Sequence, residues 1–333
     1  MNFLFIGGTG LISSASSRLA LARGHSLTLL NRGQTGHTPP PPGAEVLHAD
    51  VRDPAAVAAA LGGRNFDAVV NWIAFTVPQV EQDLAVFKGK CGQYVFISSA
   101  SAYQKPPQHY LITEETPLEN PHWEYSRNKI ACEQRLMDAW RNERFPATIV
   151  RPSLTYGPIQ IPLALGAWGA PYTLIKRARA GKPLVVPGDG TSLWPVTHNT
   201  DFAEGLLGLL GNERTLGQAF HIVSDEVMCW NQLYAEFMRA CGVEPRLVHV
   251  TSEALIALDP GLEGSLLGDK SHSVVYDSTK LRRFVPGMTF KTPFARGIRE
   301  TVAWFDADPS RQRVDAGVEA FWEKAIASLG VRA

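Results

Sequence analysis

The sequence predicts an α/β protein built on a doubly wound parallel Rossmann sheet, with a smaller C-terminal substrate-binding lobe. Short apolar segments alternate with helical patterns through the first 150 residues, as in successive βαβ units. The expected strands are nearly all apolar, which is typical of strands covered by helices on both faces. A glycine-rich stretch joins the first expected strand to the first expected helix. These three observations together carry the fold prediction.

The expected elements follow one another in a regular order. Strands are predicted at 2–6, 26–30, 44–49, 67–73, 93–98 and 147–150, and helices at 11–23, 54–61, 78–90 and about 123–143. After residue 158 the sequence is richer in Gly and Pro, and helices are expected near 201–210, 230–240 and 295–306. We assign 1–158 and 196–226 to a dinucleotide-binding domain, and 159–195 and 227–333 to a substrate-binding lobe.

Composition indicates an ordinary globular protein. The 333 residues are 45% hydrophobic and 19% charged, and 32 basic residues balance 32 acidic ones. No net field would attract nucleic acid or a membrane surface, and no run reaches the ~18 apolar residues of a membrane helix. The apolar start lacks the basic region of a signal peptide, and the four cysteines have no metal-site or redox spacing. We therefore expect a cytoplasmic protein without a metal site.

The segment FIGGTGLISS, which begins at Phe5, has the composition of a dinucleotide loop. Such a loop needs small residues for a tight turn, for close approach to the pyrophosphate and for packing of helix on strand. Gly7 and Gly10 suit the first two places, and the small Ser13 suits the third. The helix that begins near Leu11 and Ile12 would point its N-terminus at the phosphates. A plain glycine turn is the alternative, and the position between strand and helix favours dinucleotide binding.

The ends of the second and third strands bear on the choice of cofactor. An acidic residue that binds the adenosine ribose is usual after the second strand, but Asn31 and then Arg32 stand there. A guanidinium can bind a 2′-phosphate, so this favours NADP, with NAD as the alternative. Arg32 could instead merely stack on the adenine. Asp50 and Val51 end the third strand and could read the adenine edge, unless Asp50 only caps the helix after Pro54.

Tyr125 and Lys129 form the candidate catalytic pair. A spacing of four on a helix places both side chains on one face. A tyrosine pKa of about 10 is too high for efficient proton transfer at neutrality, and a nearby ammonium would lower it. Ser99, at the end of the fifth expected strand, could hold and polarise a substrate oxygen. The three residues suit proton exchange coupled to hydride transfer.

Six motifs stand along the chain: GGTGLIS, DVRD, VFISSASAY, YSRNK, RPSLTYGP and PGDGTSLWPVTHNTDFA. With them the sequence resembles the extended short-chain dehydrogenases/reductases of the epimerase and dehydratase type, over most of its length. The resemblance implies that Ser99, Tyr125 and Lys129 form the family triad and that Lys129 also holds the nicotinamide ribose. It further implies that Pro152 and Ser153 lie beside the nicotinamide.

Two departures from the family pattern concern the substrate. Ala100 and Ser101 stand where 4,6-dehydratases carry an Asp–Glu pair, so that elimination chemistry is not expected. Trp194 stands where sugar-nucleotide enzymes carry a diphosphate-binding arginine, although Arg177 and Arg179 could compensate. A nucleotide-diphosphate substrate is therefore not expected.

Two tryptophans are candidate substrate contacts. Trp123 and Trp194 could each stack on a substrate ring or could simply belong to the core. His198, in the segment that follows Trp194, is expected to be structural.

The leading hypothesis is an NADP-dependent reductase, dehydrogenase or epimerase that acts on a hydroxyl or ketone of a carbohydrate-like small molecule. The sequence does not decide between net redox and epimerisation. Some atypical members of the same superfamily, among them chloroplast proteins with a similar NRG strand end, bind RNA or act as scaffolds, which is the second hypothesis. A third is a redox sensor that binds NADP without turnover. A homodimer could form through the helices at 78–90 and 123–143.

Overall fold

The computed structural model describes residues 1–33 and 38–330. Within this part of the chain, a seven-stranded sheet has the order β11-β7-β5-β4-β1-β2-β3, and every pairing in it is parallel. Its strands are β1 Asn2–Ile6, β2 Ser26–Asn31, β3 Glu45–His48, β4 Ala68–Asn71, β5 Tyr94–Ile97, β7 Ala147–Pro152 and β11 Ala219–Ile222. The predicted parallel sheet is confirmed.

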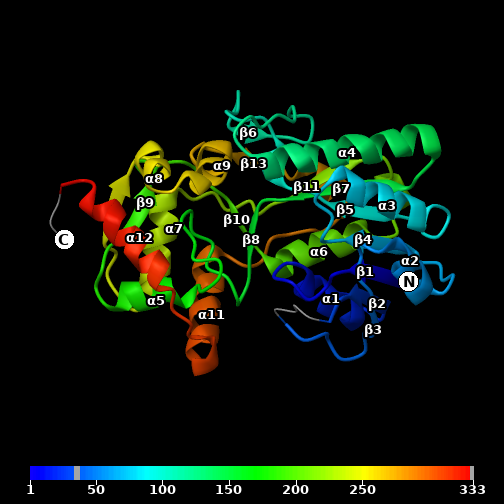
Figure 1. Ribbon diagram of the computed structural model, residues 1–333, viewed down its shortest axis with the longest axis horizontal. Helices are drawn as coiled ribbons and strands as arrows, with labels where there is room; N and C mark the ends of the chain where they lie inside the picture. The colour runs from blue at the N-terminus through cyan, green and yellow to red at the C-terminus, as the bar shows by residue number, and fades with distance from the viewer. Residues whose placement is uncertain (34–37, 331–333) are drawn as a thin grey trace.

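Helices cover both faces of this sheet, so the predicted doubly wound arrangement is confirmed as well (Figure 1). One face carries α1 (Ser13–Ala22) and α6 (Asn199–Leu209), and the other carries α2 (Pro54–Leu61), α3 (Val77–Phe87) and α4 (Glu124–Glu143). Successive side chains of a strand point to opposite faces. Phe3 and Phe5 of β1 accordingly lie in the core beneath α1 and α6, whereas Leu4 and Ile6 lie in the core beneath the other three helices.

The strand order reverses at β1, which has β2 on one side and β4 on the other. After β3 the chain crosses through α2 to the far side of β1. Ligands of open α/β sheets bind at such a switch point, outside the carboxyl ends of the strands. The glycine loop that follows β1 lies at this point, and a Cβ built on Gly7 would lie 3.3 Å from Cβ of Trp72, which follows β4.

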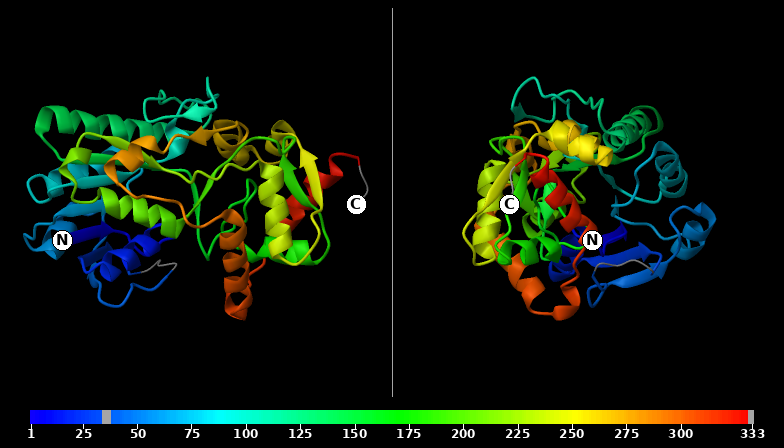
Figure 2. Two further views of the ribbon diagram at one scale, coloured as in Figure 1. Left: turned by 180° about the vertical axis from the view of Figure 1, so that it is seen from behind. Right: turned by 60° about the vertical axis from the view of Figure 1, so that its left-hand side comes forward.

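A second group of elements lies at the opposite end of the molecule from the main sheet (Figures 1 and 2). Its strands β9 (Leu184–Pro187) and β12 (Leu247–Val250) form a parallel pair. Its helices are α5 Tyr172–Arg179, α7 Trp230–Ala240, α8 Ser252–Leu258, α11 Phe294–Asp306 and α12 Ala316–Ala327. These elements share a separate hydrophobic core. None of the described helices is long and apolar enough to cross a membrane.

Two short parallel pairs lie between these two groups: β8 (Leu154–Tyr156) with β10 (Val196–His198), and β6 (Leu111–Ile112) with β13 (Val275–Tyr276). Within 196–226, which the sequence assigns to the dinucleotide-binding domain, β11 joins the main sheet and α6 packs on it, whereas β10 pairs outside it.

The segment 279–290, which follows β13, packs differently from its assignment to the substrate-binding lobe. Leu281 of α10 (Thr279–Phe284) and Met288 lie in the same core as Phe3 and Phe5 of the main sheet. This segment shows no strand and helix alternation, so its packing partner could not be read from the sequence. The boundaries of the two lobes otherwise stay a prediction.

A buried ion pair attaches α4 to the sheet. The Arg151 guanidinium, on β7, donates to both carboxylate oxygens of Glu133 on α4, with Nη2–Oε2 at 2.6 Å and Nε–Oε1 at 3.0 Å. The Ser98 hydroxyl, after β5, donates to the same carboxylate. Both charged side chains are buried. The pair sets the position of α4 against the carboxyl ends of β5 and β7.

We predict that Glu133→Gln destabilises the protein by about 3–5 kcal/mol, because it leaves the Arg151 charge buried without a counterion. The free energy of unfolding from urea denaturation is the measurement. Glu143→Gln is the matched control on the same helix, since Glu143 pairs with Lys88 and Arg135 at the surface and should matter far less. Equal losses in the two variants would contradict the importance of the buried pair.

Candidate active site

The turn after β1 requires glycine at two successive positions. Gly7 has φ of +102°, a conformation that L side chains rarely adopt, and its N–H donates to the Leu30 carbonyl at 2.9 Å. Gly8 has φ of +99°, and a Cβ there would lie 2.6 Å from Cδ2 of Leu29. The sequence assigned a role to Gly7 but not to Gly8. The positive φ at both positions, the packing of Gly7 against Trp72 and the packing of Gly8 against β2 explain why larger residues are excluded.

The rest of the loop fits a phosphate group. Helix α1 begins at Ser13, whose buried Oγ accepts a hydrogen bond from the Gly10 N–H at 2.8 Å. No described residue accepts a hydrogen bond from the backbone N–H of Leu11 or Ile12, so the helix N-terminus offers free donors to an anion. Asn199 donates its amide to the Leu11 carbonyl at 2.8 Å, a support that no sequence motif indicated.

The residues assigned to the adenosine end lie after β2 and β3, which are neighbours in the sheet. Asn31 accepts a hydrogen bond from the Gly33 N–H at 2.9 Å, and Arg32 is exposed, with no carboxylate paired to it among the described residues. Asp50 is exposed and Val51 half-buried. Asp53, not Asp50, caps α2 by accepting from two backbone N–H groups, so the capping alternative for Asp50 is wrong.

Tyr125 and Lys129 share one face of α4, as their spacing predicts. The Lys129 ammonium is buried and donates to the carbonyls of Ala74 and Ile97 at 2.7 and 2.8 Å. It lies 4.4 Å from the ring centre of Phe75 and 5.9 Å from that of Tyr125. Lys129 is therefore held between the ends of β4 and β5, beside the tyrosine.

The pKa values of the pair follow from burial. Burial raises the pKa of Tyr125, and a hydrogen bond with Ser99 opposes that rise. Burial lowers the pKa of the Lys129 ammonium to about 7. The expected lowering of the tyrosine pKa by Lys129 is not present in this structure, because the ammonium is directed at the two carbonyls of Ala74 and Ile97 and is itself poorly solvated.

Ser99 is oriented by a short network of hydroxyls. Its Oγ lies 2.8 Å from Oγ of Ser101, which accepts a hydrogen bond from Ser126 at 2.7 Å. Asn120 donates to the Ser101 carbonyl at 2.9 Å. Sequence reasoning treated Ser101 only as a departure from the dehydratase pattern. In the structure Ser101 also belongs to the site, because its hydroxyl orients that of Ser99.

The two tryptophan candidates have different surroundings. Trp123 precedes α4, is half-buried, and has its ring centre 5.0 Å from that of Tyr125. Trp194 is 1% exposed and stacks on Trp230 with ring centres 5.4 Å apart. A ring buried in this way offers no platform to a substrate, so the stacking alternative for Trp194 is wrong in this structure. Trp123 remains a candidate.

The arginines that could have compensated for Trp194 are already paired. Arg177 is buried and binds Glu319 and Glu323, each at 2.9 Å. Arg179 makes a bidentate pair with Asp306, with both distances at 2.7 Å. Neither guanidinium is available to clamp a diphosphate.

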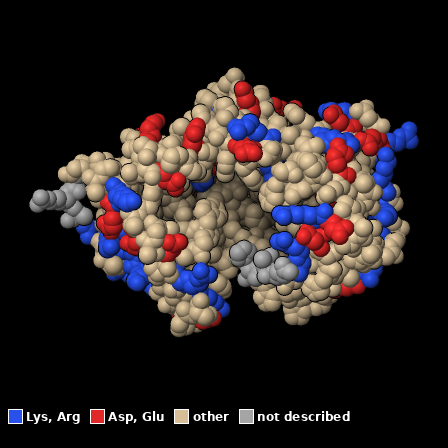
Figure 3. All heavy atoms as spheres, in the orientation of Figure 1, with Lys and Arg blue, Asp and Glu red and all other residues tan. Residues whose placement is uncertain are grey.

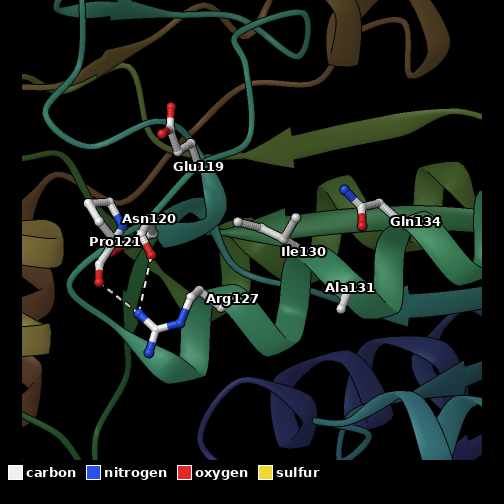
Figure 4. Close-up of a pocket in the computed structure, with 7 residues that line it drawn as sticks. All are labelled: Glu119, Asn120, Pro121, Arg127, Ile130, Ala131 and Gln134. Atoms are coloured by element: carbon white, nitrogen blue, oxygen red, sulfur yellow. Dashed lines mark hydrogen bonds between the residues drawn. The ribbon is translucent and has the colours of Figure 1, made fainter.

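Pro152 and Ser153 lie at the carboxyl end of β7, Pro152 buried and Ser153 half-buried. This is the edge of the sheet that carries Ser99 and the glycine loop. Figure 3 shows a deep hollow between the two halves of the molecule at this edge. A separate depression lined by Arg127, Ile130, Gln134 and their neighbours lies on another face of α4 and contains none of the triad (Figure 4).

Comparison with known proteins identifies the family and the fold. The NAD dependent epimerase/dehydratase family matches residues 3–223. The chain belongs to this family. It is 28% identical over 259 residues to the chloroplast stem-loop binding protein of 41 kDa b from Arabidopsis thaliana, covering 74% of this chain and 65% of that protein. It is 27% identical over 259 residues to the 2′-dehydrokanamycin reductase of Streptomyces kanamyceticus, covering 76% and 70%.

This chain therefore spans slightly less than two thirds of the length of its Arabidopsis relative. Its fold is similar to that of the epimerase Mth375 from Methanothermobacter thermautotrophicus, with a TM-score of 0.78, 16% identity and 93% of each chain covered. The family is NAD-dependent by description, and the loop geometry fits a nicotinamide dinucleotide.

We predict that Arg32→Ala weakens NADPH binding by about 1.5–3 kcal/mol, roughly tenfold or more, and barely changes NADH binding. The reason is the loss of charged hydrogen bonds to the 2′-phosphate. Fluorescence titration of both cofactors is the measurement, with Arg64→Ala, an exposed arginine paired with Glu45, as control. Equal losses for the two cofactors would mean that Arg32 only stacks on the adenine.

Proposed function

We propose that this chain binds NADP and acts on a hydroxyl or ketone of a carbohydrate-like small molecule, through Ser99, Tyr125 and Lys129. The observation that carries the proposal is that these three residues lie together at one edge of the sheet. Tyr125 and Lys129 lie on one face of α4, and Ser99 lies beside Tyr125 at the end of β5. The phosphate-binding loop opens at the same edge of the sheet.

A nicotinamide cofactor, when bound, would supply or accept the hydride. The chain's residues handle the proton and the oxygen. Ser99 Oγ, fixed by Ser101, donates a hydrogen bond to the substrate oxygen. Tyr125 gives a proton to that oxygen as the carbon is reduced, or takes one as the carbon is oxidised. Lys129, held beside the Tyr125 ring by the carbonyls of Ala74 and Ile97, would bind the ribose of the cofactor.

A 4,6-dehydratase reaction is not part of this proposal. Elimination needs an acid and a base next to the catalytic hydroxyl. Ala100 has no titratable group, and the Ser101 hydroxyl is engaged by Ser99 and Ser126. Both residues belong to a buried helical turn after β5, so neither can supply that chemistry.

Net redox and epimerisation differ in the fate of the cofactor. An epimerase returns the hydride to its own substrate and keeps the cofactor, whereas a reductase or dehydrogenase releases it. Tightly retained oxidised cofactor in the purified protein would therefore indicate an epimerase. Empty protein that consumes added NADPH would indicate a reductase.

The RNA-binding alternative is favoured by one observation, the name of the Arabidopsis relative. The balance of 32 basic and 32 acidic residues opposes it, because backbone recognition of RNA depends on excess positive charge. An RNA titration at several salt concentrations tests it, and tight, steeply salt-dependent binding would support it. A redox sensor would bind NADPH and show no consumption with any substrate.

We predict that Tyr125→Phe lowers turnover about 10²–10⁴-fold while NADPH affinity and folding stay unchanged, because only the transferable proton is removed. NADPH consumption with a substrate identified by screening is the measurement. Tyr110→Phe, at an exposed tyrosine, is the matched control. Wild-type turnover in Tyr125→Phe would refute the triad.

We predict that the substrate carries no nucleotide diphosphate. Trp194 is buried, and Arg177 and Arg179 are engaged in ion pairs. A thermal-shift screen of NADPH-loaded protein should therefore show no response to UDP-glucose or dTDP-glucose. Strong stabilisation by these compounds, without a response to simple sugars, would overturn this prediction. The S. kanamyceticus relative is named for a substrate that is not a nucleotide sugar.

A further inference from the structure

We propose that Lys105, Asp269 and Lys270 form an anion-binding subsite that receives a carboxylate or phosphate monoester on the substrate. The inference rests on the proposed function, because it names the substrate class of the same site. The subsite lies where the loop after β5 meets the segment Leu266–Lys270.

The Lys105 ammonium is the first observation. Its side chain is 0% exposed, and its Nζ has no hydrogen-bond partner among the described residues. The carboxylate of Asp269 lies 3.9 Å away, too far for a hydrogen bond. A buried ammonium without an acceptor is costly, and proteins rarely keep one without a use for it. An acceptor supplied by a ligand would remove this cost.

The charge balance is the second observation. Lys270 is buried as well, and its Nζ has only a marginal contact with the Ser265 carbonyl at 3.5 Å. Asp269 is the carboxylate that both lysines share, and burial lowers the pKa of each lysine. Glu263 is half exposed and faces His122 at 3.6 Å. When both lysines are protonated, two buried ammonium groups face the one carboxylate of Asp269, and an anion from a ligand would balance the remaining charge.

The surrounding groups add no further anion. His272 donates from Nε2 to the Leu267 carbonyl at 3.0 Å and lies near both Lys105 and Asp269. Burial lowers the pKa of His272 and so disfavours its charged form. The excess charge of the cluster is therefore not balanced locally among the described residues.

The position of the cluster links it to the catalytic residues. Asn120 donates to the carbonyls of both Ser101 and Gly268, at 2.9 and 2.6 Å. Asp269 is close enough to Tyr125 to act on its pKa, and the Lys270 ammonium lies 5.8 Å from the ring centre of Trp123. In the orientation of Figures 1 and 3, the hollow between the two halves lies below α9 (Glu263–Ser265) and β13.

The chemistry of the subsite selects a compact anion. A carboxylate or phosphate monoester can accept charged hydrogen bonds from both lysines, whereas a neutral hydroxyl cannot balance their charge. Asp269 competes with the ligand for the same two ammonium groups and so limits its affinity. We therefore infer that the substrate is an acidic sugar or a sugar phosphate.

The test uses the full chain loaded with NADPH and the probes D-glucuronate, D-glucose 6-phosphate and D-glucose. Thermal shift and calorimetry give the affinity for each. We expect at least one anionic probe to bind about tenfold or more tightly than D-glucose. Comparison of D-glucuronate with D-glucose 6-phosphate distinguishes carboxylate from phosphate.

Lys105→Met should abolish this preference and leave NADPH affinity unchanged, and Lys270→Met provides a second variant if Lys105→Met fails to fold. Lys88→Met, at an exposed lysine near Glu143, is the matched control and should keep the preference.

Asp269→Asn should increase the affinity for the anionic probe, because the competing carboxylate is lost. Weaker binding of D-glucose to Asp269→Asn would instead indicate that the Asp269 carboxylate binds a sugar hydroxyl, and would contradict an anion subsite.

Three results would overturn the subsite: equal binding of D-glucose and the anions, no binding of any probe to NADPH-loaded protein, or an undiminished preference in both lysine variants. Failure of the wild-type chain to bind NADPH, or full turnover in Tyr125→Phe, would refute the proposed function instead. The two failures are therefore distinguishable.

Discussion

The candidate site depends on the attachment of α4 to the parallel sheet. Glu133 of α4 receives the Arg151 guanidinium from β7 and the Ser98 hydroxyl from the end of β5. These contacts are buried, so only a small range of positions of α4 keeps them. A shift of α4 would leave a buried charge unpaired. Tyr125 and Lys129 lie about two turns and one turn before Glu133, respectively. Their positions relative to Ser99 therefore follow from one ion pair that takes no part in the chemistry.

The site keeps charges in places where stability alone would not keep them. Lys129 is buried with a pKa lowered to about 7, and Lys105 is buried without a hydrogen-bond acceptor. Replacement of such groups by apolar residues often stabilises a protein, and their retention is typical of functional sites. The two lysines have different surroundings. Carbonyls hold Lys129 in place, whereas Lys105 faces only a distant carboxylate, which is why we assign it to ligand binding.

The two halves of the molecule contribute differently to the site. The parallel sheet supplies the glycine loop, Ser99 and α4 at the carboxyl ends of its strands, as in other open α/β sheets. The other half supplies Asp269 and Lys270 through a segment that Asn120 ties to the catalytic side. Because Asn120 also binds the carbonyl of Ser101, the segment that carries the proposed specificity and the residue that orients Ser99 are connected through one side chain.

The sequence by itself determined the parts of this protein that depend on local order along the chain. Apolar periodicity located the strands and helices of the sheet, the glycine spacing located the phosphate loop, and the four-residue spacing placed Tyr125 and Lys129 on one face. The sequence left open whether Trp194 faces a substrate, assigned 279–290 to the other lobe, and did not reveal the packing of Gly8, the contacts of Ser101 or the burial of Lys105. Only the tertiary structure decided these points, because burial, ion pairing and the loss of hydrogen-bond partners depend on residues far apart in the chain. Arg177 shows the reason directly: its charge is visible in the sequence, but its pairing with Glu319 and Glu323 appears only when α12 packs beside α5.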